Sequence, residues 1–137
     1  MKRVWVIRCL TAALGLLFLV PGLLKLADPA EFARAIARYH LVDGPLVAVA
    51  AYWIPWMEIF GAAGLWLARW RRSGAWFLLG LVVVFELALG SAFIRGLDID
   101  CGCWGTNASG SVSFAFMRNL FLLAAVAIFL KLESDRK

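Results

Sequence analysis

Charged side chains are scarce in this sequence, and repeated segments are absent. Lys, Arg, Asp and Glu make up 17% of the 137 residues, whereas hydrophobic residues make up 64%. An ordinary soluble domain is about half apolar, so this composition excludes a soluble domain of the usual kind. The chain has no low-complexity stretch and no internal repeat, and the lack of an inverted repeat counts against a transporter. Its length allows one domain.

The apolar residues are concentrated in four runs, each long enough to cross a membrane of about 30 Å as a helix. We therefore predict an all-α integral membrane protein, built as a bundle of four transmembrane helices. The spans are expected at 4–24, 44–68, 73–94 and 112–130, within a single domain over residues 1–137. No small-residue cleavage site follows the first run, so we interpret it as a retained helix rather than a signal peptide.

The net charge of +5 suggests nucleic acid, but the distribution of basic residues favours a membrane protein and no nucleic-acid partner. Basic residues gather on the cytoplasmic side of membrane proteins. We therefore expect a multi-pass protein of the cytoplasmic membrane, with both termini in the cytoplasm and the connection between the third and fourth spans outside. Nine of the 14 basic residues fall on the predicted cytoplasmic side: Lys2, Arg3, Arg8, Arg69, Arg71, Arg72, Lys131, Arg136 and Lys137.

A short amphipathic helix is predicted directly after the first span. Asp28 is a good N-cap, Pro29 fits the first helical position, and Glu31 completes a capping-box pattern. Its apolar face follows at spacings of four and three: Phe32, Ile36 and Tyr39. We expect this helix to lie flat on the outer face of the membrane. His40 ends it, where a lone histidine is more often a partner of the helix dipole than a ligand.

Two of the three cysteines lie in the only long polar interruption between apolar runs, at 95–105. Cys101 and Cys103 are separated by a single glycine, which permits a tight turn. Their spacing lies at the upper edge of what a disulfide spans, so such a bond would close a strained and easily reduced ring. The pattern favours redox chemistry, and it leaves open half of a metal site or a plain loop with two thiols.

Two glutamates fall near the middle of predicted spans. An ionised carboxylate in hydrocarbon costs at least ~2.5 kcal/mol, so Glu58 and Glu86 should face the bundle interior. Arg118, about two turns inside the fourth span, is the expected cation for one of them. The three residues form either a structural network or a proton-handling or quinone-contacting site. Arg95 and Arg118 flank the cysteines and can stabilise a thiolate, which the neighbouring aspartates oppose.

Three segments together resemble the methylamine-utilisation MauE membrane proteins, within the DoxX-like group. They are Gly22-Leu-Leu-Lys25-Leu-Ala-Asp28-Pro29, Pro55-Trp-Met-Glu58 and Arg95-Gly-Leu-Asp98-Ile-Asp-Cys101-Gly-Cys103-Trp-Gly105. The resemblance spans nearly the whole chain, and the Cys-Gly-Cys segment is its most specific part, although Trp104 stands where Phe is more usual. It implies a four-helix bundle and a role in the maturation of methylamine dehydrogenase. There, a thioredoxin-fold (MauD-like) partner on the outer side helps to form the many disulfides of the small subunit.

The leading hypothesis is a membrane thiol–disulfide redox protein. Cys101 and Cys103 would exchange with the thioredoxin-fold partner through a mixed disulfide, in support of disulfide formation in an extracytoplasmic enzyme. This would make the chain a thiol–disulfide oxidoreductase. The sequence assigns no bound cofactor and no metal; a quinone is the candidate electron acceptor, as in vitamin K epoxide reductase-like proteins, which are similar in outline. The alternatives are a non-enzymatic membrane scaffold and, less favoured, a metal or small-solute transporter.

Overall fold

The computed structural model describes residues 1–97 and 111–135, and every regular element in these ranges is a helix. Four of the helices are long and apolar enough to cross a membrane, which confirms the predicted all-α bundle with four spans. The elements are α1 (Lys2–Ala27), α2 (Pro29–Arg38), α3 (Pro45–Trp66), α4 (Arg71–Ile94) and α5 (Val112–Ser134). Their ends differ from the predicted spans by a few residues at most.

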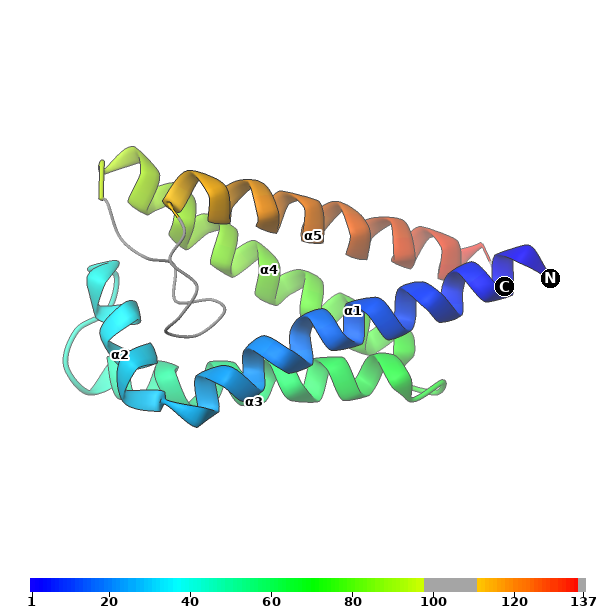
Figure 1. The fold of residues 1–137 in the computed structure, drawn as a ribbon, viewed down its shortest axis with the longest axis horizontal. Coiled ribbons are helices and arrows are strands. Elements are labelled where there is room, and N and C mark those ends of the chain that lie inside the picture. The colour runs from blue at the N-terminus through cyan, green and yellow to red at the C-terminus, as the bar shows by residue number, and fades with distance from the viewer. Residues whose placement is uncertain (98–110, 136–137) are drawn as a thin grey trace.

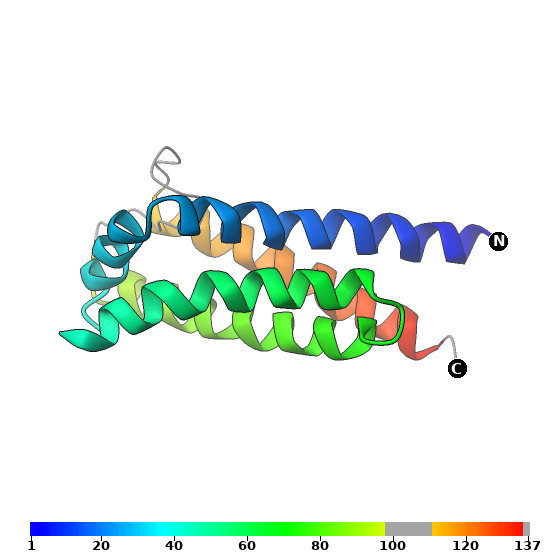
Figure 2. The ribbon, with the colours of Figure 1, turned by 90° about the horizontal axis from the view of Figure 1, so that it is seen from below.

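The four long helices run alongside one another, with both chain termini at one end of the bundle (Figures 1 and 2). We call this the terminal end. The α3–α4 turn also lies there, whereas α2, the end of α4 and the start of α5 lie at the opposite end, which we call the α2 end. At the terminal end, Arg3 donates a hydrogen bond of 3.0 Å to the carbonyl of Leu132 and so ties α1 to α5.

The main core lies in the half of the bundle near the terminal end and draws on all four long helices. Its members are Ile7, Leu14, Phe18, Ala62, Leu65, Ala75, Leu78, Val82, Val126, Phe129 and Leu130. Many large apolar residues remain exposed on the outside of the same helices, as expected where the solvent is lipid. Burial therefore separates helix contacts from lipid-facing surface, a division that composition alone does not reveal.

Helices α3 and α4 approach closely because glycines face each other. A Cβ added at Gly74 would lie 2.8 Å from the carbonyl carbon of Gly64, and one at Gly61 would lie 2.4 Å from Cδ2 of Leu78. Membrane helices are held together largely by such close packing, since lipid supplies no hydrophobic drive between them. Any side chain at Gly74 would push the two backbones apart.

Helix α2 begins as predicted and lies across the α2 end of the bundle (Figures 1 and 2). The side chain of Asp28 accepts a hydrogen bond of 3.0 Å from the backbone N–H of Glu31. Only half of the capping box forms, because the carboxylate of Glu31 binds Arg34 at 2.6 Å and Arg38 at 3.3 Å instead. After the helix, His40 adopts a left-handed φ of 51°.

The apolar face of α2 packs against the bundle. Phe32 and Ala35 form a small buried cluster with Ala51 of α3, and the apolar face also carries the buried Tyr39, next to Leu89 of α4. The predicted amphipathic helix is thus confirmed, with its apolar side packed against α3 and with Tyr39, the residue that follows it, packed near Leu89 of α4. Its position leaves a polar site beneath it, between α1 and α3.

Candidate functional site

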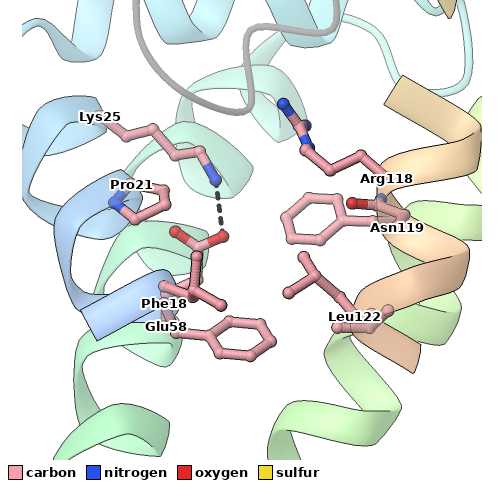
Figure 3. A pocket seen from close by; sticks show the side chains of 10 residues that line it. Phe18, Pro21, Lys25, Glu58, Arg118, Asn119 and Leu122 are labelled. Carbon is pink, nitrogen blue, oxygen red and sulfur yellow. Dashed lines mark hydrogen bonds and ion pairs between the residues drawn. The ribbon is translucent and has the colours of Figure 1, made fainter. Parts of the chain in front are cut away.

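A buried ion pair joins the last turn of α1 to the middle of α3. The ammonium of Lys25 lies 2.6 Å from Oε1 of Glu58, and the two side chains are only 1% and 5% exposed (Figure 3). Both residues lie inside segments that cross the membrane, where an unpaired charge is costly. Each charge therefore makes the other tolerable.

The backbone of α1 comes close enough for this contact because residue 22 is glycine. A Cβ added at Gly22 would lie 3.1 Å from the backbone oxygen of Pro55 and 3.3 Å from Cβ of Glu58. Two sequence segments thus lie directly against each other: the one from Gly22 to Lys25 and the one from Pro55 to Glu58. Lys25 follows Gly22 by three positions, which places it about one turn further along the same face of α1.

Two aromatic rings complete the surroundings of the ammonium. Nζ of Lys25 lies 5.2 Å from the ring centre of Phe32 on α2 and 5.0 Å from that of Phe85 on α4. Cation–π attraction at these distances adds to the ion pair, more so where water is excluded. Four helices therefore hold one lysine, and the site depends on the whole tertiary fold.

A small cavity lies beside the pair, with a volume of about 30 Å³. Lys25, Glu58, Arg118 and Asn119 supply its polar lining, with apolar side chains of α1, α4 and α5 around them. Oε2 of Glu58 is buried and has no hydrogen-bond partner among the described residues. A cavity of this size holds one water molecule.

The expectation that Arg118 offsets one of the glutamates is wrong within the described residues. Glu58 pairs with Lys25, and among the described residues no ion pair joins Arg118 to either glutamate, although Arg118 lines the same cavity (Figure 3). Both carboxylate oxygens of Glu86 are buried without a partner in the described part of the chain. Glu86 does not line the cavity; it lies one turn before Gly90, whose neighbour is Phe116 of α5.

Lys25 was not among the site residues predicted from the sequence. Two signals were available: a lysine within an apolar run, and its place in the Gly22–Pro29 segment that carries the family resemblance. Neither signal says which way the side chain points. That direction depends on the rotation of α1 against α3, which the close approach at Gly22 sets.

Arg95 connects the end of α4 to the end of α2. Its guanidinium donates hydrogen bonds to the backbone oxygen of Tyr39 and, at 3.3 Å, to that of Ser91. Burial raises the pKa of Tyr39 to about 12, so its phenol stays protonated at neutral pH. Cys101 and Cys103 lie outside the described residues, and the two ends of their connection, Ile94 and Val112, lie at the α2 end.

A second and larger cavity lies between α2, α3 and α4, with a volume of about 200 Å³. Its lining is almost wholly apolar and includes three aromatic residues: Phe32, Tyr39 and Phe85. Phe32 and Phe85 also contact the Lys25 ammonium. The ion pair and the apolar cavity are therefore neighbours that share two rings.

Comparison with known proteins identifies the family. Residues 3–132 match the family described as Methylamine utilisation protein MauE. The chain belongs to the MauE family. The match covers α2 to α4 in full, α1 without its first residue and α5 without its last two, so it takes in nearly all of the four spans and the whole Lys25–Glu58 pair.

Curated members of the MauE family are similar to this chain over most of its length. Methylamine utilization protein MauE of Paracoccus versutus is 30% identical over 125 residues, which cover 90% of this chain and 66% of that protein. The protein of the same name from Methylophilus methylotrophus is 36% identical over 80 residues, covering 58% and 42%. That of Paracoccus denitrificans is 29% identical over 116 residues, covering 84% and 62%.

The chain thus matches less than two thirds of the length of each of these relatives. No solved structure matches it.

Proposed function

We propose that this MauE-family protein is a membrane thiol–disulfide redox protein of methylamine utilisation. In this role it supports disulfide formation in an extracytoplasmic enzyme of the methylamine dehydrogenase type, together with a thioredoxin-fold partner. The observation that carries the proposal is the Cys101-Gly-Cys103 sequence between α4 and α5 of a MauE-family chain. Two cysteines with a single residue between them suit a reversible disulfide better than a structural one.

The proposed reaction is disulfide exchange. A thiolate of the reduced partner attacks one sulfur of the Cys101–Cys103 disulfide, forms a mixed disulfide and releases the other sulfur as a thiolate. The second partner thiolate then attacks the mixed disulfide. The partner leaves oxidised, and Cys101 and Cys103 remain as a dithiol that has gained two electrons. The partner can pass its new disulfide on to the client enzyme.

The membrane orientation that this reaction needs is supported by the distribution of charge. Disulfides persist outside the cytoplasm, so the α2 end should face outward. Arg3 and the three arginines at 69, 71 and 72 lie at the terminal end, where the positive-inside rule expects cytoplasmic residues. We therefore place both termini in the cytoplasm and the protein in the cytoplasmic membrane.

The Lys25–Glu58 pair has a proposed role in proton transfer during the cysteine reaction. Reduction and reoxidation of the cysteines move protons as well as electrons, and Glu58 has one carboxylate oxygen next to a cavity that can hold water. Lys25 keeps that carboxylate in position. Arg95 and Arg118 are proposed to favour the thiolate form, since both lie on elements that flank the cysteine segment.

Single cysteine variants test the exchange directly. With the oxidised form of the thioredoxin-fold partner, we expect Cys103→Ser to trap a reducible adduct, because the Cys101 thiolate attacks the partner's disulfide and releases one partner thiolate, and we expect Cys101→Ser to trap none. The reason is that Cys103 lies closer to the start of α5, whose dipole favours a thiolate that resolves toward the membrane acceptor. Nonreducing electrophoresis and mass spectrometry identify the adduct, and Cys9→Ser serves as the matched control. A reversed pattern would exchange the two roles within the same mechanism.

The double variant separates this proposal from the scaffold alternative. Replacing Cys101 and Cys103 together by Ser should abolish oxidation of the partner while the protein still inserts and folds. Full function of the double variant would reject thiol exchange and leave a non-enzymatic assembly role.

A further inference from the structure

We infer that the apolar cavity between α2, α3 and α4 is a binding site for the ring of a lipid-soluble quinone. The cavity has a volume of about 200 Å³, and its lining among the described residues comes from α2, the α2–α3 connection, α3 and α4. Engineered apolar cavities of about 150 Å³ bind benzene, so a substituted six-membered ring fits here. The assignment of the ring as a quinone rests on the proposed thiol function. The conclusion that the cavity binds a ligand does not depend on that function.

The shape of the cavity favours a compact ring over an extended acyl chain. On α3 the lining runs from Ala50 to Ile54, and on α4 from Val84 to Leu89. At 1.5 Å per residue these stretches are about 6 Å and about 7.5 Å long, close to the width of one substituted ring. Aromatic side chains from α2 and α4 form flat walls, which suit stacking with another ring.

The cavity is reached from the lipid rather than from water. Val84, which lines it, is 62% exposed on the outer surface of a membrane-spanning helix, and Leu41 at its rim is 51% exposed. A ligand with an apolar tail can therefore enter sideways and leave its tail in the bilayer. Among the described lining residues Tyr39 is the one polar side chain, so a water-soluble substrate would lose most of its hydration on entering.

The positive partner of the ion pair is the one nearer to the aromatic lining of the cavity. The positive partner, Lys25, is the one that contacts Phe32 and Phe85, and both rings also line the cavity. A positive charge in surroundings of low dielectric constant stabilises a nearby ring that gains negative charge on reduction. A saturated acyl chain gains nothing from that charge, whereas a quinone does.

A quinone here completes the electron balance of the thiol reaction. The Cys101–Cys103 dithiol gives up two electrons and two protons, its two S–H bonds break, and one S–S bond forms. The quinone takes the same two electrons and two protons, so its two carbonyls become two hydroxyls. The cavity ends at Leu89, five residues before the end of α4, which places it at the same end of the bundle as the cysteine connection.

Two substitutions of alanine by phenylalanine, one inside the cavity and one outside it, test the site. We expect tritiated decylubiquinone to bind the protein in nanodiscs above the background of empty discs. Ala50→Phe places a ring inside the cavity and should weaken binding by at least about tenfold. Ala48→Phe, two residues away on the lipid-facing side of α3, should leave affinity within about twofold. Equal affinity in both variants, or no binding by the wild type, would overturn the inference.

Two further measurements guard against misfolding and separate this inference from the proposed function. An azido derivative of decylubiquinone should cross-link to peptides of α2 or α4 in the unaltered protein, and cross-links confined elsewhere would reject the site. The Cys101→Ser/Cys103→Ser variant should bind decylubiquinone as the wild type does, and loss of binding there would count against a site made only of α2, α3 and α4. Binding of decylubiquinone by the wild type, together with no partner adduct in either single cysteine variant, would reject thiol exchange while leaving the quinone site standing.

Discussion

The ammonium of Lys25 donates a hydrogen bond of 2.6 Å to the carboxylate of Glu58, although 33 residues separate the two in the chain. The contact brings together two segments that carry the family resemblance and closes the gap between α1 and α3. The rings of Phe32 on α2 and Phe85 on α4 also lie against the ammonium. The pair is thus the point at which four helices meet.

Replacing one partner of this pair should lower the free energy of unfolding more than replacing both partners. Lys25→Met leaves a buried carboxylate uncompensated, and we expect the free energy of unfolding to fall by about 3–5 kcal/mol. The double variant Lys25→Met/Glu58→Met should recover most of that loss, because no charge is then stranded. Thermal unfolding in detergent measures both, with Lys131→Met on the exposed terminal end as the control. A double variant as unstable as the single one would mean that the pair contributes net stability.

The close contact between α3 and α4 predicts opposite effects for two glycines of α4. Gly74→Ala places a methyl 2.8 Å from the backbone of Gly64, so we expect a loss of about 1–3 kcal/mol as the helices are forced apart. Gly80→Ala meets nothing within 4 Å and should stabilise the helix by about 0.5–1 kcal/mol. Thermal melts of the two variants side by side give the comparison. Similar melting temperatures would contradict the packing.

The two membrane glutamates should respond differently to replacement by Gln. Glu86 has no partner among the described residues, so Glu86→Gln should leave stability and turnover unchanged. Glu58→Gln should fold but slow oxidation of the thioredoxin-fold partner if Glu58 carries a proton. Stopped-flow rates of partner oxidation provide the measurement. Normal rates in both variants would exclude a proton-carrying role and leave the pair as a structural contact.

Thiol labelling tests the proposed orientation. A membrane-impermeant maleimide should label reduced Cys101 or Cys103 in intact spheroplasts, because the α2 end is expected outside. Cys9 lies in α1 toward the terminal end, about 20 Å or more from the α2 end, and serves as an internal control that stays unlabelled. Labelling of the loop cysteines only after lysis would reverse the orientation.

Hydropathy and turn chemistry alone predicted the bundle. A segment in lipid must satisfy its own backbone hydrogen bonds, so four apolar runs of sufficient length leave little choice but four helices. The start of α2 was equally predictable, since an Asp-Pro pair satisfies local donors whatever lies around it. The second half of the capping box was not, because Glu31 had two arginines within reach and the sequence does not rank them against the backbone.

Only the tertiary structure decided which charges meet. The sequence placed Glu58, Glu86 and Arg118 at membrane depth, but depth says nothing about the rotation of each helix. The contact of Gly22 with the carbonyl of Pro55 sets the rotation of α1 and brings Lys25, not Arg118, to Glu58. The apolar cavity likewise arises where α2 crosses α3 and α4, and no single segment carries its outline. Local bonding determines helices, whereas partners across helices depend on how closely the backbones approach.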